Sequence, residues 1–152
     1  MSNSTQYNGN GIINNESLQT TALSDYALSK LDSGLIKIDV DEVTIGDGTV
    51  TLYQKVKAGK WILKYASFEL TEVPDSSATT LTLDVTDGTN SALSAVVTFT
   101  EGTDSVGDIL DGAIVTTANR VFTENEAVKL TVAGTSATLG KAKGVLIFLE
   151  LQ

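Results

Sequence analysis

Two groups of acidic side chains have spacings that could support chemistry. They are Asp39, Asp41 and Glu42 in one stretch, and Asp104, Asp108 and Asp111 in another. Carboxylate oxygens can bind calcium, and two carboxylates facing a cleft can hydrolyse a glycosidic bond. Neither stretch has the spacing of a complete calcium-binding loop, and nothing among the 19 acidic residues singles out a catalytic pair. We therefore predict no catalytic residue, no metal site and no cofactor.

The chain contains neither histidine nor cysteine. Without histidine it lacks the side chain best suited to proton transfer near neutral pH, so a Ser-His-Asp or Cys-His hydrolase is excluded. Without cysteine it can form no disulfide, thiolate nucleophile or thiolate metal site. Together these exclusions predict a protein that is not an enzyme.

The overall charge and hydropathy narrow the choice of partners. A formal net charge of −9 argues against nucleic acid, because neutralising phosphates requires a basic surface. No stretch approaches the roughly 18 to 20 consecutive apolar residues that span a bilayer. The N-terminus has no basic segment followed by an apolar run, so no secretory signal is visible. We expect synthesis in the cytoplasm and neither a membrane nor a nucleic-acid partner.

Charge is unevenly distributed along the sequence. Lys55, Lys57, Lys60 and Lys64 lie close together, whereas nine acids and no base lie between Lys64 and Arg120. In a homo-oligomer, this segregation could supply complementary rims that favour one docking register. The alternative is a solvated hairpin beside solvated loops, and the sequence leaves both interpretations open.

After Gly34 the hydrophobic pattern has a period of two, which is typical of half-buried strands. Strands are predicted over residues 36–40, 43–45, 49–56, 61–71, 79–86, 93–100, 113–117, 121–123, 127–133 and 144–151. Gly46-Asp47-Gly48 predicts a tight hairpin, and residues 101–112 a loop with one helical turn over 106–110. We therefore predict an all-β domain over residues 34–152, an antiparallel β-sandwich or jelly roll of about eight strands, preceded by an extended N-terminal arm. An immunoglobulin-like sandwich is disfavoured, because the Cys…Trp…Cys spacing is absent.

The predicted strand over 61–71 looks apolar on both faces. In a regular strand Trp61, Leu63 and Tyr65 share one face, and Ile62, Ala66, Phe68 and Leu70 share the other. Such a strand is central or lies in a subunit contact. We predict a subunit interface formed by Trp61, Leu63, Tyr65, Lys60 and Lys64. A sugar-binding platform of Tyr53, Trp61 and Tyr65 is the alternative.

Residues 1–33 are predicted to form an arm and a short linker. Residues 1–21 include five Asn, three Ser and three Thr, so their burial cannot offset about 1 to 2 kcal/mol of backbone entropy per ordered residue. We predict that Tyr7, Ile12, Ile13 and Leu18 anchor the arm on a partner subunit by strand addition. Burial against their own domain is the alternative. The apolar spacing over 18–31 fits a helix, although an extended linker fits as well.

A family likeness extends across the whole chain. It rests on the polar arm, the stretch from Lys57 to Ala66 (KAGKWILKYA), the Thr/Val/Asp/Gly-rich strands and the final stretch from Gly144 to Leu151 (GVLIFLEL). Together these features resemble the capsid decoration (cement) proteins of tailed phages that have a jelly-roll-like body. The resemblance implies homotrimers at threefold or quasi-threefold positions on the capsid surface of the virion, where they clamp neighbouring subunits of the major capsid protein.

We therefore expect a non-enzymatic structural protein that binds and stabilises a phage head. A first alternative is a carbohydrate-binding or receptor-binding module of a phage fibre or spike. A second is a structural component of a tail or head fibre. The sequence does not separate the head location from the tail location.

Overall fold

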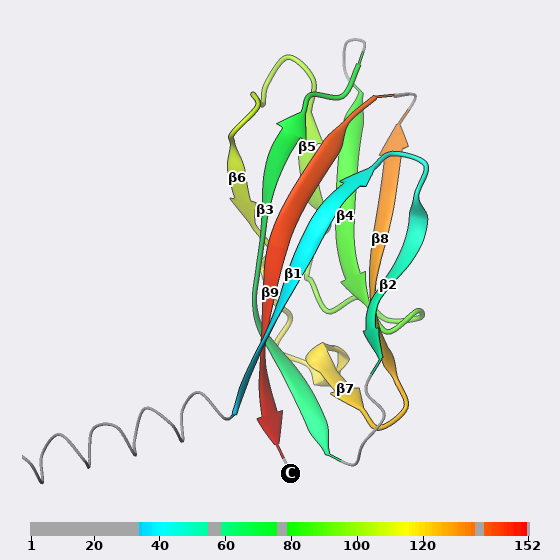
Figure 1. Cartoon of the computed structure of the whole chain (residues 1–152), viewed down its shortest axis with the longest axis vertical. Coiled ribbons are helices and arrows are strands. Elements are labelled where there is room, and N and C mark those ends of the chain that lie inside the picture. Colours follow the sequence, from blue (N-terminus) through cyan, green and yellow to red (C-terminus); the bar gives the residue numbers. More distant parts are fainter. Residues whose placement is uncertain (1–33, 55–58, 76–78, 136–138, 152) are drawn as a thin grey trace, which may run out of the picture. The chain divides into compact units, whose positions relative to one another are not determined.

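The computed structural model describes residues 34–54, 59–75, 79–135 and 139–151. These residues form nine strands and one short 3-10 helix (Figure 1). The elements in chain order are β1 (Leu35–Thr44), β2 (Gly48–Gln54), β3 (Lys60–Glu72), β4 (Thr80–Thr86), β5 (Val97–Thr100), β6 (Ile109–Asp111), the 3-10 helix η1 (Ala118–Arg120), β7 (Val121–Thr123), β8 (Ala127–Thr135) and β9 (Lys141–Leu151). The predicted arm, its four anchors and the predicted helix over 18–31 lie outside the described residues.

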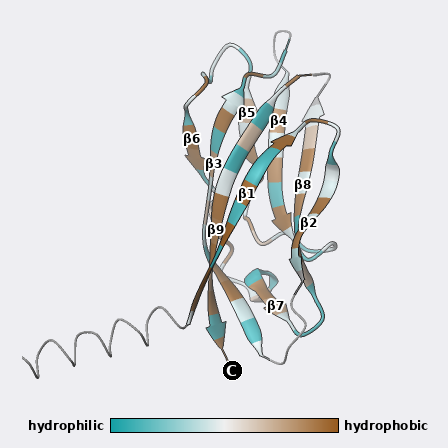
Figure 2. Cartoon of the chain, viewed as in Figure 1, coloured by the Kyte–Doolittle hydropathy of each residue, from teal (hydrophilic) through white to brown (hydrophobic). Residues whose placement is uncertain are grey.

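The strands form two facing antiparallel sheets. Sheet A has the order β1-β9-β3-β6, with β7 also paired to β3, and sheet B has the order β2-β8-β4-β5. With the short β7 set aside, successive strands are distributed between the sheets as in a jelly roll. Bands of hydrophobic and hydrophilic residues alternate along the strands of both sheets (Figure 2). The prediction of an all-β antiparallel sandwich is confirmed.

The predicted hairpin at Gly46-Asp47-Gly48 is wrong, although the turn itself is present. The carboxylate of Asp47 accepts the backbone N–H of Thr44 at 2.8 Å, and Gly46 and Gly48 have φ angles of 102° and 66°. The strands that flank this turn do not pair. β1 lies beside β9 in sheet A and β2 beside β8 in sheet B. The turn residues specify a local reversal of the chain, whereas longer strands from elsewhere in the sequence decide the pairing.

The predicted faces of the strand over 61–71 are also wrong, because β3 contains a bulge. The register to β9 shifts between Leu63, which pairs with Phe148, and Tyr65, which pairs with Ile147. Lys64 and Tyr65 are therefore both exposed. Buried side chains precede and follow the bulge on one inner face: Trp61, Leu63, Ala66, Phe68 and Leu70. The apparent two-sided apolar character of this strand comes from the change of face at the bulge.

The segment between β5 and β7 differs from its prediction as well. Residues 106–110 form no helical turn; instead the backbone N–H of Gly107 donates to Leu70 O at 2.8 Å, and that of Leu70 donates to Asp108 O at 2.9 Å. These bonds lead the chain onto the edge of β3, where β6 begins. The strand predicted over 113–117 is reduced to an isolated bridge between Leu93 and Ile114.

The core lies between the two sheets. Its largest fully buried side chains are Phe68, Phe99, Phe122, Phe148, Leu63, Leu70, Leu81, Leu83, Leu130, Leu146, Val85 and Val128. Aromatic rings close the end where β2 ends and β3 begins. The ring centroid of Trp61 lies 4.5 Å from that of Tyr53 and 5.8 Å from that of Phe148. Among the described residues, no helix has the length and apolarity to cross a membrane.

Candidate partner-binding surfaces

The outward faces of the two sheets differ in chemistry. Sheet B presents mainly threonine: Thr49, Thr51, Thr80, Thr82, Thr98, Thr100 and Thr131 are exposed or half-buried. On sheet A, the buried residues Leu146 and Phe148 of β9 alternate with half-buried Val145, Ile147 and Leu149. This apolar row continues onto β3, because Ile147 pairs with Tyr65 and Leu149 with Ile62. Sheet A therefore has the outer face better suited to an apolar contact.

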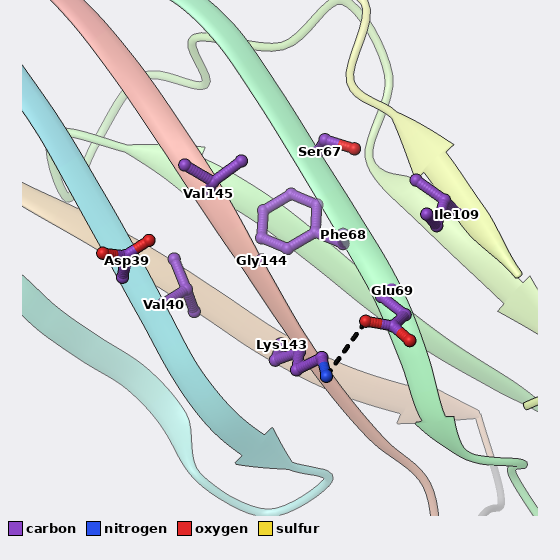
Figure 3. Close-up of a pocket in the computed structure, with 9 residues that line it drawn as sticks. All are labelled: Asp39, Val40, Ser67, Phe68, Glu69, Ile109, Lys143, Gly144 and Val145. Carbon is purple, nitrogen blue, oxygen red and sulfur yellow. Dashed lines mark ion pairs between the residues drawn. The ribbon is translucent and has the colours of Figure 1, made fainter. Parts of the chain in front are cut away.

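A hollow of about 400 Å³ opens on this face (Figure 3). Its lining residues are Asp39, Val40, Ser67, Phe68, Glu69, Ile109, Lys143, Gly144 and Val145. Ile109 is 64 % exposed at one side, and the ammonium of Lys143 lies 3.1 Å from the carboxylate of Glu69. The hollow thus combines an apolar surface with an ion pair. Neither histidine nor cysteine stands beside the Ser67 hydroxyl, because the sequence contains neither residue type.

A second depression, of about 470 Å³, lies between β1 and β2, which are edge strands of the two sheets. We call it the acidic groove. It is lined by Asp39, Asp41, Glu42, Val43, Asp47, Val50, Thr51 and Leu52. Val50 and Leu52 are only half-buried. The groove therefore has apolar side chains between carboxylates, and it follows an open sheet edge.

The carboxylates of this groove differ in their partners. Asp39 forms an ion pair with Lys37, and Asp47 caps the turn at Thr44. Glu42 accepts a hydrogen bond from the Thr71 hydroxyl at 2.7 Å. Asp41 is exposed, and it has no salt bridge among the described residues. Asp41 thus differs from Asp39 and Glu42, which have ion-pair or hydrogen-bond partners within the chain.

Lys141 of β9 also lies close to a carboxylate of the groove. Lys141 lies 3.1 Å from Glu72 and 3.9 Å from Glu42. A hydrogen bond to Glu72, with the negative charges of Glu72 and Glu42, raises the pKa of Lys141 above 10.5. Lys141 is thus already engaged by carboxylates of its own chain.

The acids near residues 104–111 act as local hydrogen-bond acceptors. Asp104 accepts the backbone N–H of Thr100 at 2.6 Å, and Asp108 accepts that of Ser105 at 2.8 Å. Asp111 accepts the hydroxyl proton of Tyr65 at 3.0 Å. Within the part of the chain that the structure describes, no group of three or more acidic, histidine or cysteine side chains is placed to hold a metal ion. The spacing of these acids is explained by the loop and strand edge that they stabilise.

The predicted subunit-interface residues fall into two sets. Trp61 and Leu63 are 3 % and 0 % exposed within the chain's own core. Tyr65 is 41 % exposed, and Lys60 and Lys64 are exposed as well. The interface stays a prediction, and these last three residues are the ones that present side chains to solvent. Trp61 packs against Tyr53 in a tilted arrangement and is 3 % exposed, so it cannot serve as an exposed face of the alternative sugar platform of Tyr53, Trp61 and Tyr65.

Sequence reasoning missed two contributors to these surfaces. The outward row of Val145, Ile147 and Leu149 was signalled by the unbroken apolar run from Val145 to Leu149. The acidic groove had no such signal, because it depends on β1 and β2 entering different sheets.

The chain is therefore a jelly-roll sandwich with an apolar row on the outer face of sheet A and an acidic groove between β1 and β2. No family model matches the chain, and no curated protein matches it either. Among solved structures, a chain of the cyanophage Pam1 capsid asymmetric unit is similar over 78 % of this chain and 85 % of that chain, with a TM-score of 0.51 and 16 % identity. At this identity the likeness establishes a shared fold.

Two further structures show weaker similarity. The infectious bursal disease virus VP2 subviral particle has a TM-score of 0.44 and 16 % identity, over 78 % of this chain and 32 % of that chain. A disulfide-linked pilus of Bacillus endospore appendages has a TM-score of 0.33 and 18 % identity, over 78 % and 89 % of the two chains.

Proposed function

We propose that this chain is a non-enzymatic structural protein of a virion. More specifically, it acts as a decoration protein that binds the major capsid protein on the head surface as a homotrimer. The observation that best supports the proposal is the fold shared with a chain of a cyanophage capsid asymmetric unit, which extends over 85 % of that chain. The match therefore concerns most of one capsid-associated chain and not a domain of a larger protein.

The surfaces support the same proposal. The sandwich presents an apolar row on the outer face of sheet A and an open, charged edge between β1 and β2. Both features suit contacts between protein subunits, which combine apolar centres with polar rims. The sequence has neither histidine nor cysteine, so a Ser-His-Asp or Cys-His hydrolase mechanism is excluded.

The proposed mechanism is stabilisation by binding. A protein that binds only the assembled shell stabilises that shell by its binding free energy. In a trimer, three arms act together, and their effective concentration multiplies individually modest contacts. The arm, residues 1–33, is proposed to supply these contacts through Tyr7, Ile12, Ile13 and Leu18.

Deleting residues 1–33 tests this mechanism. The truncated chain should keep its oligomeric mass and its β-type circular dichroism, but it should no longer sediment with purified capsids. The matched variant is the full-length chain with Tyr7, Ile12, Ile13 and Leu18 each changed to serine, which keeps the length and removes the anchors. Truncated protein that still saturates the capsids would contradict the role of the arm.

A further inference from the structure

We infer that copies of this chain associate head to tail, with the acidic groove of one copy holding the basic patch of the next. The basic patch consists of Lys60, Ile62, Lys64 and Tyr65 on β3. This inference deepens the proposed function, because it assigns the surfaces through which the proposed homotrimer forms. The occupant of the groove is therefore a second copy of this chain.

The groove defines what its occupant must offer. Half-buried Val50 and Leu52 require an apolar side chain, and the uncompensated charge of Asp41 requires a cation beside it. An isolated cation without an apolar neighbour would leave Val50 and Leu52 in contact with water. A surface that carries both at close spacing fits best.

The basic patch offers this combination. Lys60 and Lys64 are exposed, and neither forms a salt bridge within the described part of the chain. Between them in the sequence lies Ile62, which is half-buried, and Tyr65 follows with 41 % of its surface exposed. Two carboxylates lie beside the patch: Asp111 accepts the Tyr65 hydroxyl proton, and Glu124 lines a hollow together with Lys60 without forming a salt bridge to it among the described residues. The two lysine charges thus remain available to a partner.

Other lysines of sheet A are committed within the chain. Lys37 pairs with Asp39, Lys141 with Glu72 and Lys143 with Glu69. The contrast separates the two lysines of the patch from their neighbours on the same sheet. Lys55 and Lys57 add positive charge just before the patch in the sequence and lie outside the described residues.

Net charge gives this pairing its selectivity. Each chain carries −9, so two copies repel unless the contact brings opposite charges together. Contact between the basic patch and the acidic groove brings opposite charges together. Contact between two acidic surfaces would instead cost electrostatic free energy. Self-association should therefore select the orientation in which the patch faces the groove.

The two surfaces lie on different strands of sheet A. The groove lies at its β1 edge, and the patch lies on β3, with β9 between the two strands. When the patch of each copy faces the groove of the next, the interface is heterologous, and it forms a ring if the rotation between copies closes. A ring of this kind closes at three subunits in the proposed trimer.

Charge reversal tests the inference in the full-length chain. The patch variant is Lys60→Glu with Lys64→Glu, and the groove variant is Asp41→Lys with Thr51→Lys. These positions avoid the turn cap at Asp47 and the ion pairs of Lys37, Lys141 and Lys143. Light scattering should give the wild type about three times the mass of one chain, and each variant the mass of a single chain. The variant with all four changes should return to the wild-type mass, because the charges attract again with their signs exchanged.

Controls make each outcome decisive. Glu101→Lys reverses a charge just after β5, at the edge of sheet B opposite β2, and should leave the oligomer intact. Circular dichroism checks that each variant folds, and Lys60→Ser with Lys64→Ser replaces the patch variant if the glutamates prevent folding. A wild type that is monomeric, variants that keep the wild-type mass, or a four-change variant that stays monomeric would each overturn the inference.

Capsid binding is measured separately by sedimentation of the wild type with purified shells. If the wild type binds shells while reversal leaves its mass unchanged, the head-to-tail contact is wrong and the proposed function stands. If the oligomer responds to charge reversal as expected but the wild type does not bind shells, the head-to-tail contact stands and the proposed function fails.

Discussion

The indole N–H of Trp61 donates to Glu150 Oε1 at 2.7 Å, across directly paired positions of β3 and β9. The ring of Trp61 is 3 % exposed and lies between Tyr53 and Phe148. A buried indole needs an acceptor for its N–H, and here a carboxylate on the neighbouring strand provides it. This single bond ties the aromatic end of the core to the last strand of the chain.

Removing that acceptor should weaken the fold. We expect Glu150→Ala to lower the free energy of unfolding by about 1 to 3 kcal/mol, because a buried donor loses its partner. Glu150→Gln keeps an acceptor oxygen and should lose less. Urea unfolding followed by fluorescence reports directly on this site, since Trp61 is the only tryptophan. Equal losses in the two variants would show that the hydrogen bond does not matter.

Gly144 should not tolerate a side chain. A Cβ at this position would lie 2.3 Å from the carbonyl oxygen of Ser67 and 2.6 Å from Phe68 Cδ1. Because the first of these atoms belongs to the backbone, Gly144→Ala must move β9 away from β3. We expect a loss of about 1 to 3 kcal/mol or more from overpacking.

The comparison for that prediction is Gly102→Ala. Gly102 has open space around it but a φ of 80°, so alanine there experiences only backbone strain, about 1 to 2 kcal/mol. Thermal unfolding of both variants should rank Gly144→Ala as the more damaging. The reverse order would mean that the contact at Gly144 relaxes easily.

Asp87 should make the free energy of unfolding depend on pH in the acidic range. Its carboxylate accepts the backbone N–H groups of Thr89 and Asn90 at 2.6 and 2.7 Å. Partial burial raises the pKa of Asp87, but hydrogen bonds from Asn90 and Thr89 outweigh it and hold the pKa below its ordinary value of 3.8. The charged Asp87 therefore stabilises the fold fully above pH 3.8. This stabilisation is lost as the pH falls through the pKa of Asp87 in the folded state, which lies below 3.8. Asp87→Asn should lose less stability than the wild type over this acidic range, as measured by urea midpoints against pH.

Asp84 should have the opposite effect on the pH dependence of stability. Burial raises the pKa of Asp84 above 3.8, although the Ser91 hydroxyl, at 2.5 Å, donates a hydrogen bond that lowers it. The charged form is thus unfavourable in the folded state, and this penalty is relieved as the pH falls from the raised pKa towards 3.8. The stability of Asp84→Asn relative to the wild type should be greatest at neutral pH and should shrink on acidification. A constant difference across this range would contradict the assignment.

Local patterns in the sequence predicted the strands well, because alternation reflects burial of one face. The same patterns failed where one residue changes the geometry. The bulge at Lys64 and Tyr65 reverses the faces of β3, and an alternating pattern cannot show which residue is the extra one. The turn at Asp47 was predicted, but the separation of β1 from β2 depends on pairing with β9 and β8.

The candidate surfaces depended still more on tertiary structure. The sequence showed a cluster of lysines, but only the fold shows that Lys37, Lys141 and Lys143 have partners while Lys60 and Lys64 have no salt bridge among the described residues. Likewise, the acids Asp39 and Asp41 were visible, but the apolar floor beside them comes from β2. Spacing alone therefore identified charged residues without showing which charges were available.

Electron cryomicroscopy of purified shells, with and without the added full-length chain, tests the central claim most directly. The proposed decoration role predicts extra density on the outer surface at threefold or quasi-threefold positions, with the size of three jelly-roll bodies. Shells without added density at saturating protein, or density confined to the tail or its fibres, would contradict that role.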